Sequence, residues 1–176
     1  MRTISIRRIS ITELDTDTIV NAANSGLQAG GGVCGAIFRA AGYEELQAAC
    51  DEIGYCETGS AVITPGFRLK AKYVIHAVGP VWHGGHDAEP LLLYSCYRQA
   101  LQLAAQNGCC SIAFPLISAG IYGYPKDRAF EKAIESCRDF LQKNPDVQMD
   151  IVFAVLDEET ERLGKRILRD TAPEFG

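Results

Sequence analysis

The spacing of apolar residues along the chain changes repeatedly between the two-residue period of strands and the 3.6-residue period of helices. Strand-like patterns cover residues 4–9, 17–22, 60–64, 73–78, 111–117 and 150–156. Helix-like patterns cover residues 33–49, 90–106, 126–142 and 158–168. Alternation of this kind is typical of α/β proteins. We therefore expect a mixed, mostly parallel sheet between helical layers, with residues 4–9 as an edge strand.

The domain organisation follows from the absence of linkers, low-complexity tracts and internal repeats. The chain has 176 residues, of which 47% are hydrophobic and 22% charged, as in ordinary globular proteins. We expect one domain over residues 1–170 and a flexible tail over 171–176, where periodicity is lost. The uncharged stretch 73–82 is far shorter than the ~20 residues that span a bilayer. Residues 1–8 alternate and lack the apolar block of a secretory signal, so we expect a cytoplasmic protein with no membrane partner. We also expect a monomer.

Charge and metal-binding residue types exclude several function classes. The formal net charge is -5, which argues against general affinity for nucleic acids. Seven cysteines with no C-x-x-C pair indicate reduced thiols rather than a disulfide framework. His83, His86 and Asp87 lie close in sequence but lack a fourth ligand, so we expect a solvated loop there. We expect neither a metal nor a cofactor.

Two glycine-containing loops each follow a predicted strand and precede a predicted helix. The first spans residues 26–35, and the second spans residues 118–125. A helix N-terminus offers unpaired N–H groups and a positive dipole end, so two such loops at neighbouring strand ends could hold two linked phosphates. No Lys or Arg occurs between Arg8 and Arg39, or within residues 111–125. An anion bound here would be held by main-chain amides.

The glycines fit two common phosphate-binding motifs poorly. A P-loop needs a Gly-Lys-Ser/Thr ending, which is absent. Gly30, Gly32 and Gly35 satisfy the dinucleotide pattern G-x-G-x-x-G, but nine residues separate Gly30, the first of them, from the strand end at Val20. The next strand also ends without the acidic residue that binds a ribose hydroxyl. Both loops could also be tight turns without a ligand. No G-x-S-x-G elbow of a serine hydrolase is present.

Five collinear segments resemble the macrodomain family. They are Ile-Val-Asn-Ala-Ala-Asn-Ser at 19–25, the glycine run and Arg-Ala-Ala-Gly within 30–42, Thr-Gly at 58–59, His-Ala-Val-Gly-Pro-Val-Trp at 76–82, and Pro-Leu-Ile-Ser-Ala-Gly-Ile-Tyr-Gly-Tyr-Pro at 115–125. The similarity covers residues 4–168 and is greatest to the MacroD-type subfamily, which includes bacterial O-acetyl-ADP-ribose deacetylases. It implies a three-layer α/β/α fold that binds ADP-ribose or an ADP-ribosylated substrate.

The resemblance also implies the roles of individual residues. Asn24 would contact the distal ribose and help place a water, and Cys34 occupies the second catalytic position. Gly32, Val33 and Cys34 would border the diphosphate and the distal ribose. Adenine would lie near Ser10, Ile11 and Leu156. The second loop would wrap the phosphates through Ser118, Ala119, Gly120, Ile121 and Tyr122, with Tyr122 against the distal sugar.

Three positions depart from the family pattern. Ser10 replaces an Asp that accepts a hydrogen bond from adenine, and Leu156 replaces an aromatic residue that covers it. Cys34 replaces the Asp that activates water. At that position the helix dipole favours a thiolate, whereas a bound diphosphate disfavours it. Three hypotheses remain open. The first is hydrolysis of ADP-ribose esters or of mono-ADP-ribosylated protein. The second is binding of ADP-ribose or a related nucleotide without hydrolysis, and the third is a pocket retuned for another phosphorylated metabolite.

Overall fold

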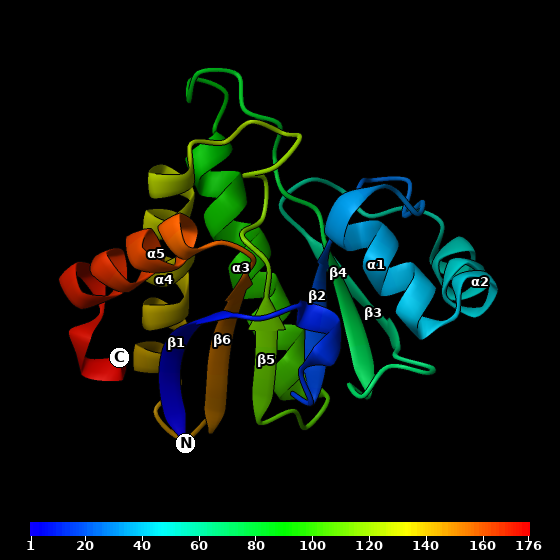
Figure 1. Cartoon of the computed structure of the whole chain (residues 1–176), viewed down its shortest axis with the longest axis horizontal. Coiled ribbons are helices and arrows are strands. Elements are labelled where there is room, and N and C mark those ends of the chain that lie inside the picture. The colour runs from blue at the N-terminus through cyan, green and yellow to red at the C-terminus, as the bar shows by residue number, and fades with distance from the viewer.

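The protein is built on one six-stranded sheet, and the structure, a computed structural model, describes all 176 residues. The strands are β1 (Arg2–Arg8), β2 (Thr18–Ala22), β3 (Ala61–Pro65), β4 (Tyr73–Ala77), β5 (Ser111–Phe114) and β6 (Met149–Val155). Their order is β1-β6-β5-β2-β4-β3, and only the β3–β4 pair is antiparallel. The expected mixed, mostly parallel sheet is confirmed, with β1 at one edge (Figure 1).

Helices cover both faces of the sheet, which gives the expected three layers (Figure 1). They are α1 (Gly32–Ala41), α2 (Tyr43–Ile53), α3 (Glu89–Gln106), α4 (Lys126–Lys143) and α5 (Glu158–Thr171), with short 3-10 turns η1 (Ile11–Glu13) and η2 (Pro173–Phe175). The larger apolar core packs the sheet against α3, α4 and α5, and a smaller core packs it against α1 and α2. Side chains on β2 alternate between them: Val20 belongs to the larger core and Ile19 to the smaller one.

The single helix predicted over residues 33–49 is wrong, because the structure has two helices there, α1 and α2. Gly42 separates them with φ of +104°, a backbone conformation that favours glycine. Its N–H donates to the carbonyl of Phe38 and ends α1, and its own carbonyl accepts the N–H of Leu46 and starts α2. The break turns α2 away from α1, so that α2 packs beside the loop that follows β2.

The C-terminal residues differ from the expected flexible tail. Helix α5 continues to Thr171, Ala172 is fully buried, and η2 follows directly. The strand predicted over residues 111–117 is shorter than expected, since β5 ends at Phe114 and Pro115 has no N–H to continue the ladder. None of the helices combines the length and apolarity needed to cross a membrane.

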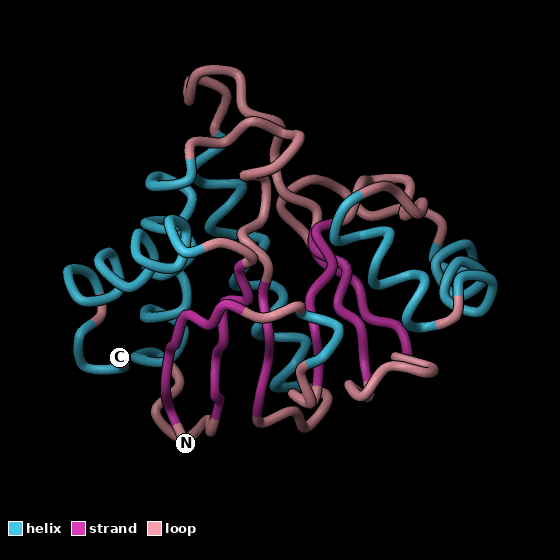
Figure 2. Tube along the Cα trace, viewed as in Figure 1, coloured by secondary structure: helices cyan, strands magenta, loops and turns pink.

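The sheet places the two glycine-containing loops on the same side. The four neighbouring parallel strands β6, β5, β2 and β4 end at one edge, which faces the upper loops in Figure 2. The first loop connects β2 to α1, and the second connects β5 to α4. Because β2 and β5 are paired neighbours, their following loops meet above the same edge, where ligands bind in open α/β sheets.

Candidate functional site

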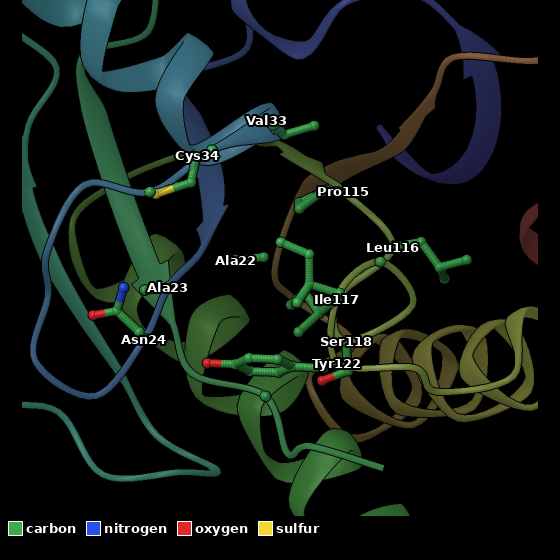
Figure 3. A pocket seen from close by; sticks show the side chains of 16 residues that line it. Ala22, Ala23, Asn24, Val33, Cys34, Pro115, Leu116, Ile117, Ser118 and Tyr122 are labelled. Atoms are coloured by element: carbon green, nitrogen blue, oxygen red, sulfur yellow. The ribbon is translucent and has the colours of Figure 1, made fainter.

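A cavity of about 400 Å³ lies between the two loops, at the carboxyl ends of β2 and β5 (Figure 3). Its walls come from the first loop, the start of α1, the residues after β4 and the second loop. The lining residues are Ala22, Ala23, Asn24, Gly30, Gly31, Gly32, Val33, Cys34, Gly79, Pro115, Leu116, Ile117, Ser118, Gly120, Ile121 and Tyr122. The volume falls within the range of small-molecule sites.

A second cavity of about 220 Å³ adjoins the first, because Gly32, Val33 and Pro115 line both. Its other walls are Ile9, Ser10, Ile11, Ala36, Ala154 and Leu156. The Ser10 hydroxyl pairs with that of Thr12 at 3.0 Å, and the Leu156 side chain is 69% exposed. The two cavities form one elongated cleft with a largely apolar pocket at the second end.

The first loop folds closely over the start of α1. A Cβ at Gly35 would lie 2.6 Å from the carbonyl oxygen of Gly30, so only glycine allows this approach. Gly32 has φ of +56° at the first position of the helix. The N–H groups of Gly32, Val33 and Cys34 have no partner within the protein, as expected for a first helical turn. This wall therefore offers hydrogen-bond donors without a charged side chain.

The second loop is held by a buried tyrosine. The Tyr97 hydroxyl accepts the N–H of Ile117 at 2.9 Å and donates to the carbonyl of Pro115 at 3.2 Å. Burial raises the pKa of Tyr97 well above its ordinary value, so this hydroxyl stays protonated and can keep donating. Ser118 has φ of +69°, a strained conformation for a residue with a side chain. Gly79 packs so closely against Ser118 that a Cβ there would collide with its Oγ.

The second loop, like the first, has main-chain N–H groups that make no hydrogen bond within the protein. The N–H groups of Gly120, Ile121 and Tyr122 have no partner within the protein, while the carbonyl of Tyr122 accepts the N–H of Trp82 at 2.9 Å. Ile121 is 96% exposed although it lines the cavity. Two opposite walls of the cleft thus carry free main-chain donors, a pattern that binds anions.

Asn24, Cys34 and Tyr122 surround one end of the larger cavity, whereas Val33 and Pro115 lie toward the other (Figure 3). The Asn24 amide is tied to the backbone of Gln28 by two hydrogen bonds, of 3.0 and 2.8 Å. Cys34, in the first turn of α1, is half-buried. Cys34 and Tyr122 are the only ionisable side chains in the lining.

The charge of the cleft follows from its lining. No Lys, Arg or His lines either cavity, and no Asp or Glu does so. Asp157 follows Leu156, but its carboxylate accepts hydrogen bonds from the N–H and the hydroxyl of Thr160 and caps α5. These bonds hold the pKa of Asp157 below its usual value. A bound anion would therefore depend on main-chain amides.

The loop that contains His83, His86 and Asp87 is organised by the carboxylate of Glu89. Glu89 is buried and accepts the N–H groups of His83, Gly85 and Asp87 at 2.7, 3.0 and 2.6 Å. Burial raises the pKa of Glu89, but these hydrogen bonds lower it more, to about 2. His83 and His86 are exposed, and the structure has no group of three or more His, Cys, Asp or Glu side chains that could hold a metal ion.

A buried polar cluster lies beneath the site, between the sheet and α2. His76 Nδ1 contacts Asn21 Nδ2 at 3.1 Å, and its Nε2 contacts Thr64 Oγ1 at 3.0 Å and Cys50 Sγ at 3.7 Å. Burial lowers the pKa of His76 to about 4, so the ring is neutral at physiological pH. His76 is therefore a structural, hydrogen-bonded histidine, as its position within a strand predicts.

The structure brings the sequence-predicted residues to one cleft with a single exception. Ser10, Ile11 and Leu156 line the smaller cavity, Gly32 and Val33 line both, and the others line the larger one. Ala119 lines neither cavity: its side chain packs against the larger core and its N–H donates to Leu116. Sequence reasoning missed Gly79 as part of the wall, although the Gly79-Pro80 pair after a buried strand was a signal for a close approach.

Comparison with known proteins agrees with this fold. The family model described as "Macro domain" matches residues 20–133. A protein named "O-acetyl-ADP-ribose deacetylase" from Cronobacter turicensis is 50% identical over 169 residues, which cover 94% of this chain and 95% of that protein. A "Macro domain-containing protein" from Chlorobaculum tepidum is 51% identical over 154 residues, 88% of this chain and 89% of that protein.

Solved structures of macrodomains share this fold. The Oceanobacillus iheyensis macrodomain, solved with ADP, has a TM-score of 0.90 and 39% identity, and covers 96% of this chain and 91% of its own. The Trypanosoma brucei macrodomain in complex with ADP-ribose has a TM-score of 0.87 and 39% identity, over 95% of this chain and 69% of its own. The chain belongs to the macro domain family.

Proposed function

We propose that the cleft binds ADP-ribose and that the protein hydrolyses ADP-ribose esters, with deacetylation of O-acetyl-ADP-ribose as the leading reaction. Removal of mono-ADP-ribose from modified proteins uses the same end of the cleft and is the second substrate class. Support comes from relatives about 50% identical over nearly the whole chain that carry the deacetylase name, and from neighbours solved with ADP and ADP-ribose.

One observation carries the proposal: two loops with unpartnered main-chain N–H groups line one cavity that has no basic side chain. A diphosphate is the ligand group that matches two adjacent amide walls. The adenine then falls in the smaller cavity beside Ser10, Ile11 and Leu156. The distal ribose falls at the other end, with Asn24, Cys34 and Tyr122 around it.

The reaction at that end is attack of water on the acyl carbon of the ester. The bond between the acyl carbon and the ribose oxygen breaks, and the water proton is transferred to that oxygen. The Asn24 amide keeps one N–H and one lone pair free of the Gln28 backbone, so it can orient both the water and a ribose hydroxyl. No carboxylate lines the cavity, which leaves the Cys34 sulfur and the substrate phosphate to accept the proton.

The test is hydrolysis of O-acetyl-ADP-ribose and of a mono-ADP-ribosylated protein by wild type and Asn24→Ala. Turnover by wild type that falls about 100-fold or more in Asn24→Ala supports the proposal. Saturable ADP-ribose binding without turnover supports a second candidate, a non-catalytic binding module, which the replacement of the usual Asp by Cys34 favours. Absence of ADP-ribose binding in calorimetry contradicts both candidates.

A further inference from the structure

The orientation of Asn24 is set by the peptide backbone four residues later. Its Oδ1 accepts the N–H of Gln28 at 3.0 Å, and its Nδ2 donates to the carbonyl of Gln28 at 2.8 Å. If the Asn24 amide were flipped, its Nδ2 would face the N–H of Gln28, which is also a donor, and its Oδ1 would face the carbonyl of Gln28, which is also an acceptor. The free N–H and lone pair of Asn24 therefore point where the Gln28 peptide units dictate.

Those peptide units are held in turn by a side chain of α2. Gln47 Oε1 accepts the N–H of Ala29 at 2.9 Å, and Gln47 Nε2 donates to the carbonyl of Leu27 at 3.1 Å. One carboxamide thus clamps the residues on both sides of Gln28. Asp51, one helical turn further along α2, accepts from Nε2 of Gln47 at 3.0 Å and from Nε2 of Gln28 at 3.3 Å.

The clamped segment is strained, which explains why it needs such support. Leu27 is buried and has φ of +55°, a left-handed conformation that side chains disfavour. A strained residue of this kind persists only where its surroundings fix it. Without the Gln47 carboxamide, the carbonyl of Leu27 and the N–H of Ala29 lose their partners, and the peptides around Gln28 can rearrange.

We propose that Gln47, supported by Asp51, is a positioning residue for Asn24. This inference rests on the proposed function, since it assigns a role within the same reaction. Neither Gln47 nor Asp51 lines either cavity of the cleft, so neither touches a substrate bound there. The main-chain N–H groups that we assign to the diphosphate lie elsewhere, at the start of α1 and in the second loop. Loss of Gln47 should therefore impair the chemical step and leave ADP-ribose binding largely intact.

The experiment compares Gln47→Met, which keeps the length of the side chain but removes its hydrogen bonds, with Gln102→Met. Gln102 is an exposed glutamine on α3 that makes no side-chain hydrogen bond, so it is a matched control. For Gln47→Met we expect kcat to fall about 10- to 100-fold, with KM and the Kd of ADP-ribose within about threefold of wild type. Asp51→Asn keeps an acceptor for Gln47 and should retain most of the activity. An unchanged kcat in Gln47→Met overturns the inference. So does a loss of ADP-ribose affinity as large as the loss of kcat, accompanied by a lower melting temperature, because a merely structural role would produce both.

A second readout separates this inference from the proposed function. In a ¹H–¹⁵N spectrum of wild type, the side-chain amide of Asn24, assigned through Asn24→Ala, should give one sharp pair of signals. In Gln47→Met that pair should shift and broaden, while Gln102→Met leaves it unchanged. If wild type shows no turnover, the proposed function fails but this comparison still decides the inference. An Asn24 signal identical in wild type and Gln47→Met shows that Gln47 does not position it.

Discussion

The close approach of Gly35 to the first loop gives the sharpest prediction from the geometry of the site. In Gly35→Ala the new Cβ would lie 2.6 Å from the carbonyl oxygen of Gly30 and 3.1 Å from Nη1 of Arg39. The arginine side chain can move, but the carbonyl belongs to the loop backbone. To reach an ordinary contact of 3.4 Å, Gly30 must retreat by about 0.8 Å.

Two effects on stability oppose each other. Relief of the collision costs about 1–3 kcal/mol, whereas alanine in place of glycine within a helix contributes about 1 kcal/mol. The free energy of unfolding should therefore fall by no more than about 2 kcal/mol. Binding should suffer more, because the displaced loop adjoins the amides of α1. Loss of one hydrogen bond to a charged phosphate, worth about 1.5–3 kcal/mol, weakens the affinity about 10- to 150-fold.

Isothermal calorimetry with ADP-ribose and denaturant unfolding measure both effects. Gly26→Ala is the control, because its Cβ would meet no atom closer than 3.7 Å and Gly26 lines neither cavity. We expect Gly26→Ala to match wild type in both measurements. If Gly35→Ala binds ADP-ribose within about twofold of wild type, the contact with Gly30 does not shape the site and the reasoning is refuted.

Three further predictions concern single side chains. Cys34→Asp supplies a carboxylate ionised at neutral pH and should raise kcat for O-acetyl-ADP-ribose about tenfold or more; equal turnover would show that position 34 takes no proton. Ser10→Asp and Leu156→Phe should each strengthen ADP-ribose binding about fivefold, worth about 1 kcal/mol, and calorimetry that shows no gain would place adenine elsewhere. Burial lowers the pKa of His76 from 6.5 to about 4, so its neutral form contributes stability fully above pH 6.5. As the pH falls from 6.5 to 4, this histidine is protonated in the unfolded chain before it is protonated in the folded one, so the free energy of unfolding falls by about 3 kcal/mol. Urea unfolding of His76→Gln should show a free energy of unfolding that depends less on pH over this range, and an unchanged dependence contradicts the assignment.

The order and type of most elements could be predicted because each carries its own apolar period. The break between α1 and α2 was missed because apolar positions continue across Gly42. Glu44 and Glu45 in the first turn of α2 mark a new helix start, and that local signal was available in the sequence. The packing at the end of the chain could not be predicted for a different reason: Ala172 is buried by tertiary contacts that no periodicity reveals.

The residues of the candidate site could be predicted where glycine-containing loops precede predicted helices, because such loops supply free main-chain donors. The two loops join one cavity because β2 and β5 are neighbours, which follows from the topology of the sheet. The clamp of Gln47 on the first loop could not be predicted. It joins residues 18 and 20 positions apart through side-chain hydrogen bonds, and it depends on the direction that α2 takes after Gly42.

The dependence of ADP-ribose affinity on ionic strength tests the central claim most directly. An anion held by basic side chains binds more weakly as salt screens the attraction, as phosphate contacts of Lys and Arg do in nucleic-acid complexes. Here the protein carries a formal net charge of -5 and no cation lines the cleft. Calorimetry from about 0.05 to 0.5 M NaCl should therefore show an affinity that stays constant or rises slightly, because salt screens only the net repulsion. An affinity that falls about tenfold over that range would contradict binding by main-chain amides alone.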